Sequence, residues 1–247
     1  MNKTIEEIKI SSVDDFFTQL INSKYHYFRG ESNASYFLNS SILRKKNQDI
    51  NFEKLKDLVS DHHKEYERII SNQHSFSRFL FYIQHSISFS PFIDLTKSPW
   101  IALSFVLEDI QRNSDSNIET NGTIYGIRLH DKIVDNPIIL STHEKIENVL
   151  KKLDLSKTKK AIIKPYIINP TDLSILNDRM QYQQGAFLLL ENDSLNHNSV
   201  YNQENVTIVK YIITKQLLKE LFFTLREQHP QHTIKYLYDP YRWFRNI

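Results

Sequence analysis

The chain contains 247 residues, of which 40% are hydrophobic and 24% are charged, and these proportions are typical of a folded globular protein. The absence of cysteine excludes disulfides, thiolate zinc sites, iron–sulfur clusters and cysteine nucleophiles. The net charge of +2 is too small to indicate nucleic-acid binding by itself, and an acidic N-terminal segment without any apolar run of ~20 residues predicts a cytoplasmic protein with no membrane partner.

The first predicted helix begins after Ser12, which together with Asp15 forms the pattern of a capping box. Apolar residues at helical spacing follow it: Val13, Phe16, Phe17, Leu20 and Ile21. A short strand is predicted over Tyr25–Phe28, ending at Arg29 and Gly30, and a polar loop from Glu31 to Asn33 follows. Two further helices are predicted at about Phe52–Ser71 and Ser75–Ser86.

The next unit of the chain combines a strand, a polar turn and a helix. Phe92–Leu95 is predicted to be a short buried strand, and Ser98 is placed as the N-cap of a helix that begins at Pro99 and continues to Arg112. The N–H groups at the start of a helix point toward whatever occupies the preceding turn. This unit therefore predicts a binding site around Asp94–Ser98.

Strands and helices also alternate in the second half of the chain. Strands are predicted at Thr123–Leu129, Ala161–Ile168, Gly185–Leu190 and Val206–Ile213, with an aromatic tail at Tyr236–Phe244. Helices are predicted at Ser141–Leu153 and Thr214–Glu227, with Ser141 and Thr214 as their N-caps. We therefore expect a single α+β domain over residues 1–247, with a central mixed or split β-sheet and flanking helices.

Several common sites are excluded by the sequence. Only four glycines occur, so neither a phosphate loop nor a dinucleotide fingerprint exists, and each glycine is expected where a side chain would collide with backbone or ligand. His62 and His63 would face opposite sides of a helix, which predicts no metal site. The lysines at 151–160 fit a solvated surface better than a phosphate-binding track.

Three motifs together resemble the FRG domain family, named for a Phe/Tyr-Arg-Gly motif. The first is Phe28–Glu31, continued at Leu38, Ser40 and Arg44; the second is Gln84-His85 followed by Asp94–Pro99; the third comprises Arg179, Gln183, Gly185 and Phe187. The resemblance covers about residues 25–190. The sequence departs from the family's usual pattern at Ser86–Pro91, where the arginine and glycine of that pattern are missing.

The order of these motifs is similar to that of ADP-ribosyltransferases, which is an analogy of arrangement. It implies an ADP-ribosyltransferase-like fold and an enzyme that consumes NAD as a substrate and modifies a cellular macromolecule, either nucleic acid or protein. A bacterial toxin or phage-defence effector is the implied context, with an antitoxin or regulatory protein as a further partner. The alternative is a non-catalytic module that binds a nucleotide or a partner protein.

The resemblance also implies roles for individual residues. Arg29 and Gly30 would hold the pyrophosphate or ribose, although Arg29 also suits a structural ion pair. Thr96 and Ser98 would orient the nicotinamide end, with a plain N-cap as the other interpretation of Ser98.

Two further residues are expected to act in catalysis with Arg29. Gln183 matches a position where transferases usually carry glutamate, so its neutral amide would position the ribose. His85 is expected to be a general base or a hydrogen-bond donor, unless it is simply packed. Glu31 and Asp94 are the nearest acids, and a structural role suits Asp94 better.

Overall fold

The computed structural model of the chain describes residues 6–38, 61, 92–112, 120–129, 138–140, 165–170, 183–190 and 206–238. The helices predicted at 52–71, 75–86 and 141–153, and the part of the tail beyond 238, lie outside these residues apart from Asp61. In the part described, no helix is long and apolar enough to cross a membrane.

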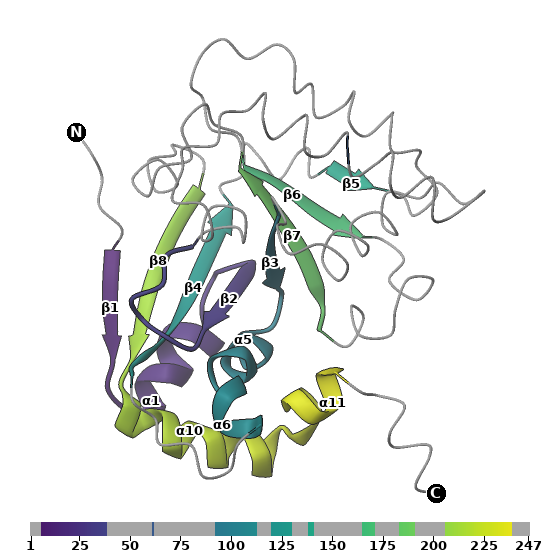
Figure 1. Ribbon diagram of the computed structural model, residues 1–247. Helices are drawn as coiled ribbons and strands as arrows, with labels where there is room; N and C mark the ends of the chain where they lie inside the picture. The colour runs from purple at the N-terminus through teal and green to yellow at the C-terminus, as the bar shows by residue number, and fades with distance from the viewer. Residues whose placement is uncertain are drawn as a thin grey trace, which may run out of the picture.

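Within the described residues, eight strands form one mixed sheet in the order β1-β8-β4-β2-β3-β7-β6-β5 (Figure 1). In chain order they are β1 Glu6–Ile10, β2 Tyr27–Glu31, β3 Phe92–Thr96, β4 Gly122–Leu129, β5 Ile138–Leu140, β6 Pro165–Pro170, β7 Gly185–Leu190 and β8 Val206–Ile213. β1 pairs parallel to β8 and β5 parallel to β6, whereas the other pairs are antiparallel. The mixed sheet with helices agrees with the predicted α+β class.

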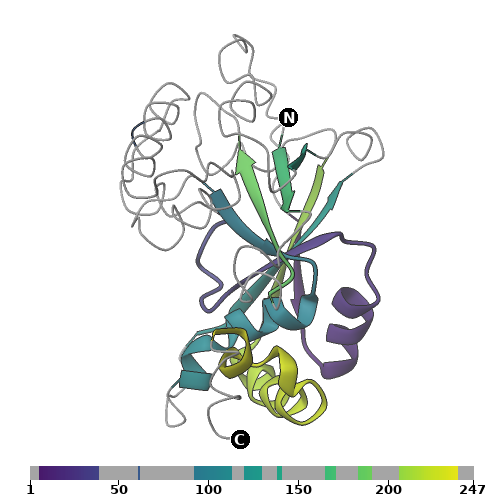
Figure 2. The same cartoon turned by 90° about the vertical axis from the view of Figure 1, so that its right-hand side faces the viewer.

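Helices cover one face of the β1-β8-β4-β2 half of the sheet (Figures 1 and 2). The helical elements are α1 Val13–Phe16 continued by the π-helical turn η1 Phe17–Ile21, α5 Pro99–Val106, α6 Glu108–Arg112, α10 Lys215–Gln228, the 3-10 turn η2 Pro230–His232 and α11 Ile234–Tyr238. The predicted N-caps are confirmed, because the side chains of Ser12, Ser98 and Thr214 each accept a hydrogen bond from the first turn that follows.

Alternation along β2 divides its side chains between two cores. Phe28 belongs to the core under α1, α5 and α10, whereas Tyr27 belongs to a second core with Leu95 and Tyr125 on the other face. Arg29 and Glu31 have the same parity as Tyr27, so both lie on that second face, while Gly30 faces α5. β2 therefore presents the charged side chains of Arg29 and Glu31 next to each other on one face and Gly30 on the face that meets α5.

Three predicted boundaries are corrected by the structure. β2 begins at Tyr27 and continues through Glu31, because residues 27–31 pair with β4 along the whole of that segment. β6 ends at Pro170, two residues beyond the predicted end. The helix predicted over Pro99–Arg112 is two helices, since the backbone at Leu107 leaves the helical region, and the carbonyl of Ser104 accepts a bond from the Gln111 side chain at 3.1 Å.

Gly30 is required by the closeness of β2 to α5. A Cβ placed on Gly30 would lie 1.9 Å from the backbone oxygen of Ala102. α5 is buried around most of its circumference, so it cannot move away without disturbing the core on its other sides. The expectation that glycine marks a close approach is confirmed here, and the approaching group is a helix backbone.

Gly30→Ala should therefore destabilise the protein by about 3 kcal/mol, because overpacking against rigid backbone forces the strand and helix apart. Gly126→Ala is the matched control: its methyl would meet the Tyr25 ring at 3.0 Å, and a ring can tilt. Urea unfolding of both variants measures the difference. Equal stability of the two variants would contradict the steric argument.

Acid should weaken the contact between the C-terminal helices and α5. The His229 ring packs against Trp100 with ring centroids 4.0 Å apart and the ring planes tilted by 31°. Burial lowers the pKa of both His229 and His232, and the charge of His229 lowers the pKa of His232 further. The unfolded chain then binds more protons than the folded chain, so stability falls as pH drops below the ordinary histidine value of about 6.5.

Thermal unfolding between pH 8 and pH 5 checks this expectation. The double variant His229→Asn/His232→Asn should lose less stability across that range than the wild type, because asparagine at these two positions does not titrate. Identical pH profiles for the two proteins would show that these histidines do not contribute.

Candidate functional site

A cavity of about 210 Å³ lies where β2 and β3 meet. The two strands share one paired position, Phe28 opposite Thr96, whereas β2 pairs with β4 at five positions. The sheet is therefore open beside that pair. Side chains and backbone of β2, β3, the α5–α6 region and the turn before β7 line the opening: Phe28, Arg29, Gly30, Glu31, Ser32, Asp94, Leu95, Thr96, Phe105, Glu108, Asp109 and Gln183.

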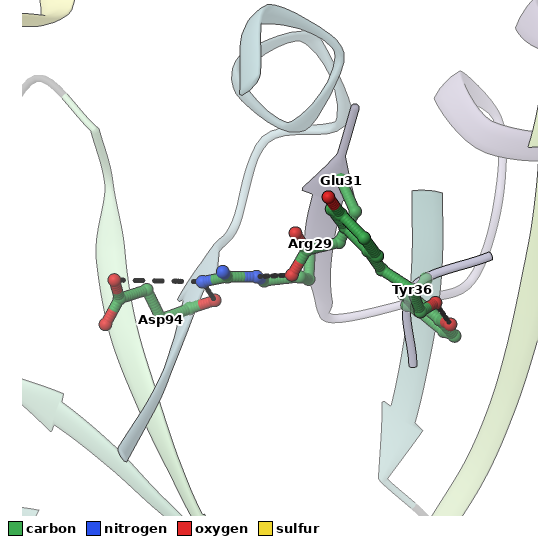
Figure 3. Close-up of polar contacts among 5 residues, drawn as sticks. Arg29, Glu31, Tyr36 and Asp94 are labelled. Atoms are coloured by element: carbon green, nitrogen blue, oxygen red, sulfur yellow. Dashed lines mark hydrogen bonds and ion pairs between the residues drawn. The ribbon is translucent and has the colours of Figure 1, made fainter. Parts of the chain in front are cut away.

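Arg29 spans the opening between the two strands (Figure 3). Its Nε donates to Oε1 of Glu31 at 2.9 Å, which strand alternation places on the same face two residues on. Its Nη1 donates to the backbone oxygen of Asp94 at 3.0 Å and lies 3.7 Å from the Asp94 carboxylate. The expected structural ion pair is thus present, and it lies in the wall of the cavity.

The Arg29–Glu31 pair is well shielded from solvent. The side chains are 18% and 8% exposed, respectively, whereas the Asp94 side chain is 55% exposed. Removing one partner of a shielded pair leaves the other charge poorly solvated, so Arg29 and Glu31 depend on each other. The ion pair between Arg29 Nη1 and the Asp94 carboxylate is long and the Asp94 side chain is exposed to solvent, so this pair adds little to stability.

The Thr96 hydroxyl joins three segments of the cavity wall. It donates to the backbone oxygen of Gln183 at 2.8 Å and accepts from the N–H of Ser98 at 3.1 Å. The N–H of Lys97 also donates to the oxygen of Gln184 at 3.2 Å. These bonds connect the turn before β7 to the turn before α5, although the two turns are 87 residues apart in the chain.

Gln183 contributes a buried amide to the cavity region. Its Nε2 atom is buried and, in the part of the chain that the structure describes, has no hydrogen-bond partner. The next residue, Gln184, has φ 47°, a left-handed conformation that costs energy for a residue other than glycine. A strained turn beside an unsatisfied amide is a combination often found at functional sites.

Carboxylates predominate among the charged residues described around the cavity. Glu31, Asp94, Glu108 and Asp109 accompany the one guanidinium of Arg29. The sequence analysis missed Glu108 and Asp109, because it placed them inside one continuous helix, whereas the structure has them at the start of α6, directly after the break at Leu107. Within the ranges described, no group of three or more histidine, cysteine, aspartate or glutamate side chains could hold a metal ion.

The structure brings four of the predicted site residues into the cavity lining: Arg29, Gly30, Thr96 and Gln183. Ser98 is buried and is absent from the cavity lining. It is the N-cap of α5, and its Oγ accepts a hydrogen bond from the backbone nitrogen of Ile101 at 3.4 Å. His85 lies outside the described residues. Their functional roles remain predictions.

Comparison with known proteins supports part of the resemblance found in the sequence. The FRG domain family matches residues 24–115, which include the first two motifs and exclude the third. Comparison with curated proteins and with solved structures returned no match. The matched segment contains Arg29 and Thr96, whereas Gln183 lies outside it and is brought to the cavity by the folding of the chain.

Thr96→Val should destabilise the protein by about 1–3 kcal/mol, because the buried Ser98 N–H and the partly buried Gln183 carbonyl would both lose a partner. Thr96→Ser keeps the hydroxyl and is the matched control, with a smaller loss from the missing methyl group. Chemical denaturation of the two variants separates these effects. A valine variant as stable as the serine variant would show that the hydroxyl is dispensable.

Proposed function

We propose that the protein is an NAD-dependent ADP-ribosyltransferase that modifies a cellular macromolecule, nucleic acid or protein, as a bacterial toxin or phage-defence effector. The observation that carries the proposal is that Arg29, Thr96 and Gln183, from three distant segments, line one cavity. The motif order of ADP-ribosyltransferases requires these positions to meet. The ADP-ribosyltransferase-like fold is part of the same proposal.

The charge around the cavity suits the reacting end of NAD. In the reaction the bond between nicotinamide nitrogen and ribose C1′ breaks, its electron pair leaves with nicotinamide, and C1′ becomes oxocarbenium-like. An acceptor nucleophile then bonds to C1′ and gives up a proton. Glu31, Asp94, Glu108 and Asp109 favour the cationic nicotinamide ring and the developing positive charge.

Gln183 has a defined part in this proposal. A buried amide nitrogen without a partner costs about 1–3 kcal/mol, and a ligand oxygen that reached it would recover that cost. Gln183 then orients the ribose or the carboxamide, while the neighbouring carboxylates supply the negative charge that its amide lacks.

In this proposal Arg29 is mainly a positioning residue that holds the residues of the cavity wall in place. Since its Nε and Nη1 donate to Glu31 and to the Asp94 backbone, it fixes two acids beside the ligand. The neutral amide of Gln183, at a position where transferases usually carry glutamate, favours a second candidate function, a module that binds a nucleotide without reaction. Turnover distinguishes the two functions.

Incubation of the full chain with labelled NAD, an oligonucleotide and a bacterial protein extract tests the proposal. The wild type should release nicotinamide and label an acceptor. Gln183→Ala should lower kcat/KM by about 100-fold, the typical effect of removing a group that stabilises the transition state. Arg29→Ala should also lower kcat/KM, because Glu31 and the Asp94 backbone lose the guanidinium that fixes them beside the ligand. Gln183→Glu should retain or increase activity, because it adds negative charge at the ribose.

Gln184→Asn is the matched control, since it alters an adjacent amide that does not line the cavity and since asparagine tolerates the left-handed conformation. Its activity should equal that of the wild type. No nicotinamide release by the wild type with both acceptors present would contradict the enzyme. NAD binding without release, abolished in Arg29→Ala, would establish the binding module.

A further inference from the structure

The cavity is too small for a whole dinucleotide. Its volume of about 210 Å³ is below the roughly 300–1,000 Å³ of pockets that enclose a drug-sized ligand. If NAD enters by its nicotinamide end, as the proposed function requires, the adenosine end lies outside on the rim. The surface beside the cavity must then provide its contacts.

One side of this rim is the loop that follows β2. The loop begins at Ser32, which lines the cavity, and residues 33–36 form a turn in which the N–H of Tyr36 donates to the Asn33 oxygen at 3.0 Å. The ends of such a turn lie within about 7 Å of each other. Tyr36 is therefore held close to the start of the loop and to the cavity.

Two hydrogen bonds hold the loop against β4 and the residue that precedes it. The Tyr125 hydroxyl donates to the Tyr36 oxygen at 2.6 Å, and the N–H of Ala34 donates to the oxygen of Asn121 at 2.7 Å. Tyr125 is fully buried in β4, directly opposite Arg29. The backbone under Tyr36 is thus fixed by the same part of the sheet that carries the cavity wall.

Tyr36 exposes an aromatic ring at this position. It is 45% exposed, and Figure 3 shows its side chain extending toward Glu31. Among the residues described, the exposed large hydrophobic side chains are Tyr36, Phe37 and Phe223, so two of the three belong to this loop. An exposed ring on a fixed backbone binds a flat group at little cost in conformational entropy.

We infer that the Tyr36 ring stacks on the adenine of NAD while the nicotinamide end occupies the cavity. Every base has a flat π-face, and stacking on an aromatic side chain contributes about 1–3 kcal/mol per base. This inference rests on the proposed function, and it adds the subsite that binds the second half of the dinucleotide.

Titration calorimetry of the full chain with NAD and with nicotinamide mononucleotide, which lacks adenosine, tests the subsite. Tyr36→Ala should weaken NAD binding by about 10-fold and leave binding of the mononucleotide unchanged. Tyr36→Phe keeps the ring and should bind NAD like the wild type. Phe223→Ala removes an exposed ring from α10, none of whose residues line the cavity, and should change neither affinity.

The outcomes separate this inference from the proposed function. Unchanged NAD affinity in Tyr36→Ala, or an equal loss for both ligands, overturns the stacking role while NAD use stands. Binding of NAD that depends on Tyr36, without any turnover, supports the subsite and contradicts the transferase. If the wild type binds neither ligand, the proposed function fails and the subsite fails with it.

Discussion

The structure depends on the guanidinium of Arg29 at the junction of β2 and β3. These strands share one paired position, and the Arg29 side chain reaches the Asp94 backbone beside that pair, 65 residues away in the chain. Glu31 fixes the direction of the guanidinium from the same strand. One side chain thereby connects two halves of a sheet that backbone pairing alone joins weakly, and it leaves a cavity beside the connection.

The other walls of the cavity depend on equally specific contacts. Gly30 lets α5 approach β2 until backbone meets backbone, and Thr96 connects the turn of Gln183 to the turn that begins α5. Each of these residues was expected to touch a ligand, and each has a structural contact that would explain its presence without one. The two roles are compatible, since a site that must not move requires its lining to be held by the fold.

The surroundings of the cavity also suggest how a larger ligand would be divided between two environments. The carboxylates described in its lining favour a cationic group inside, whereas the loop from Ser32 to Phe37 offers exposed rings outside. In the proposed function, the cationic nicotinamide ring and the neutral adenine of NAD would occupy these two places. The Tyr125 hydroxyl holds the loop at Tyr36, and Tyr125 lies in β4 directly opposite Arg29 of β2. The loop and the cavity wall are therefore attached to the same strand.

The sequence by itself determined the features that neighbouring residues control. Ser12, Ser98 and Thr214 cap their helices through bonds to residues three positions away. The strands predicted at Gly185–Leu190 and Val206–Ile213 are β7 and β8 with their observed bounds. Only the tertiary structure decided that Glu6–Ile10 forms the strand β1, because this charged segment is held by its pairing with β8 and by the ion pair between Glu7 and Lys210. Only the tertiary structure, too, decided that Glu108 and Asp109 line the cavity. Such contacts join residues far apart in the chain, and local propensity contains no information about which distant backbone or side chain will complete them.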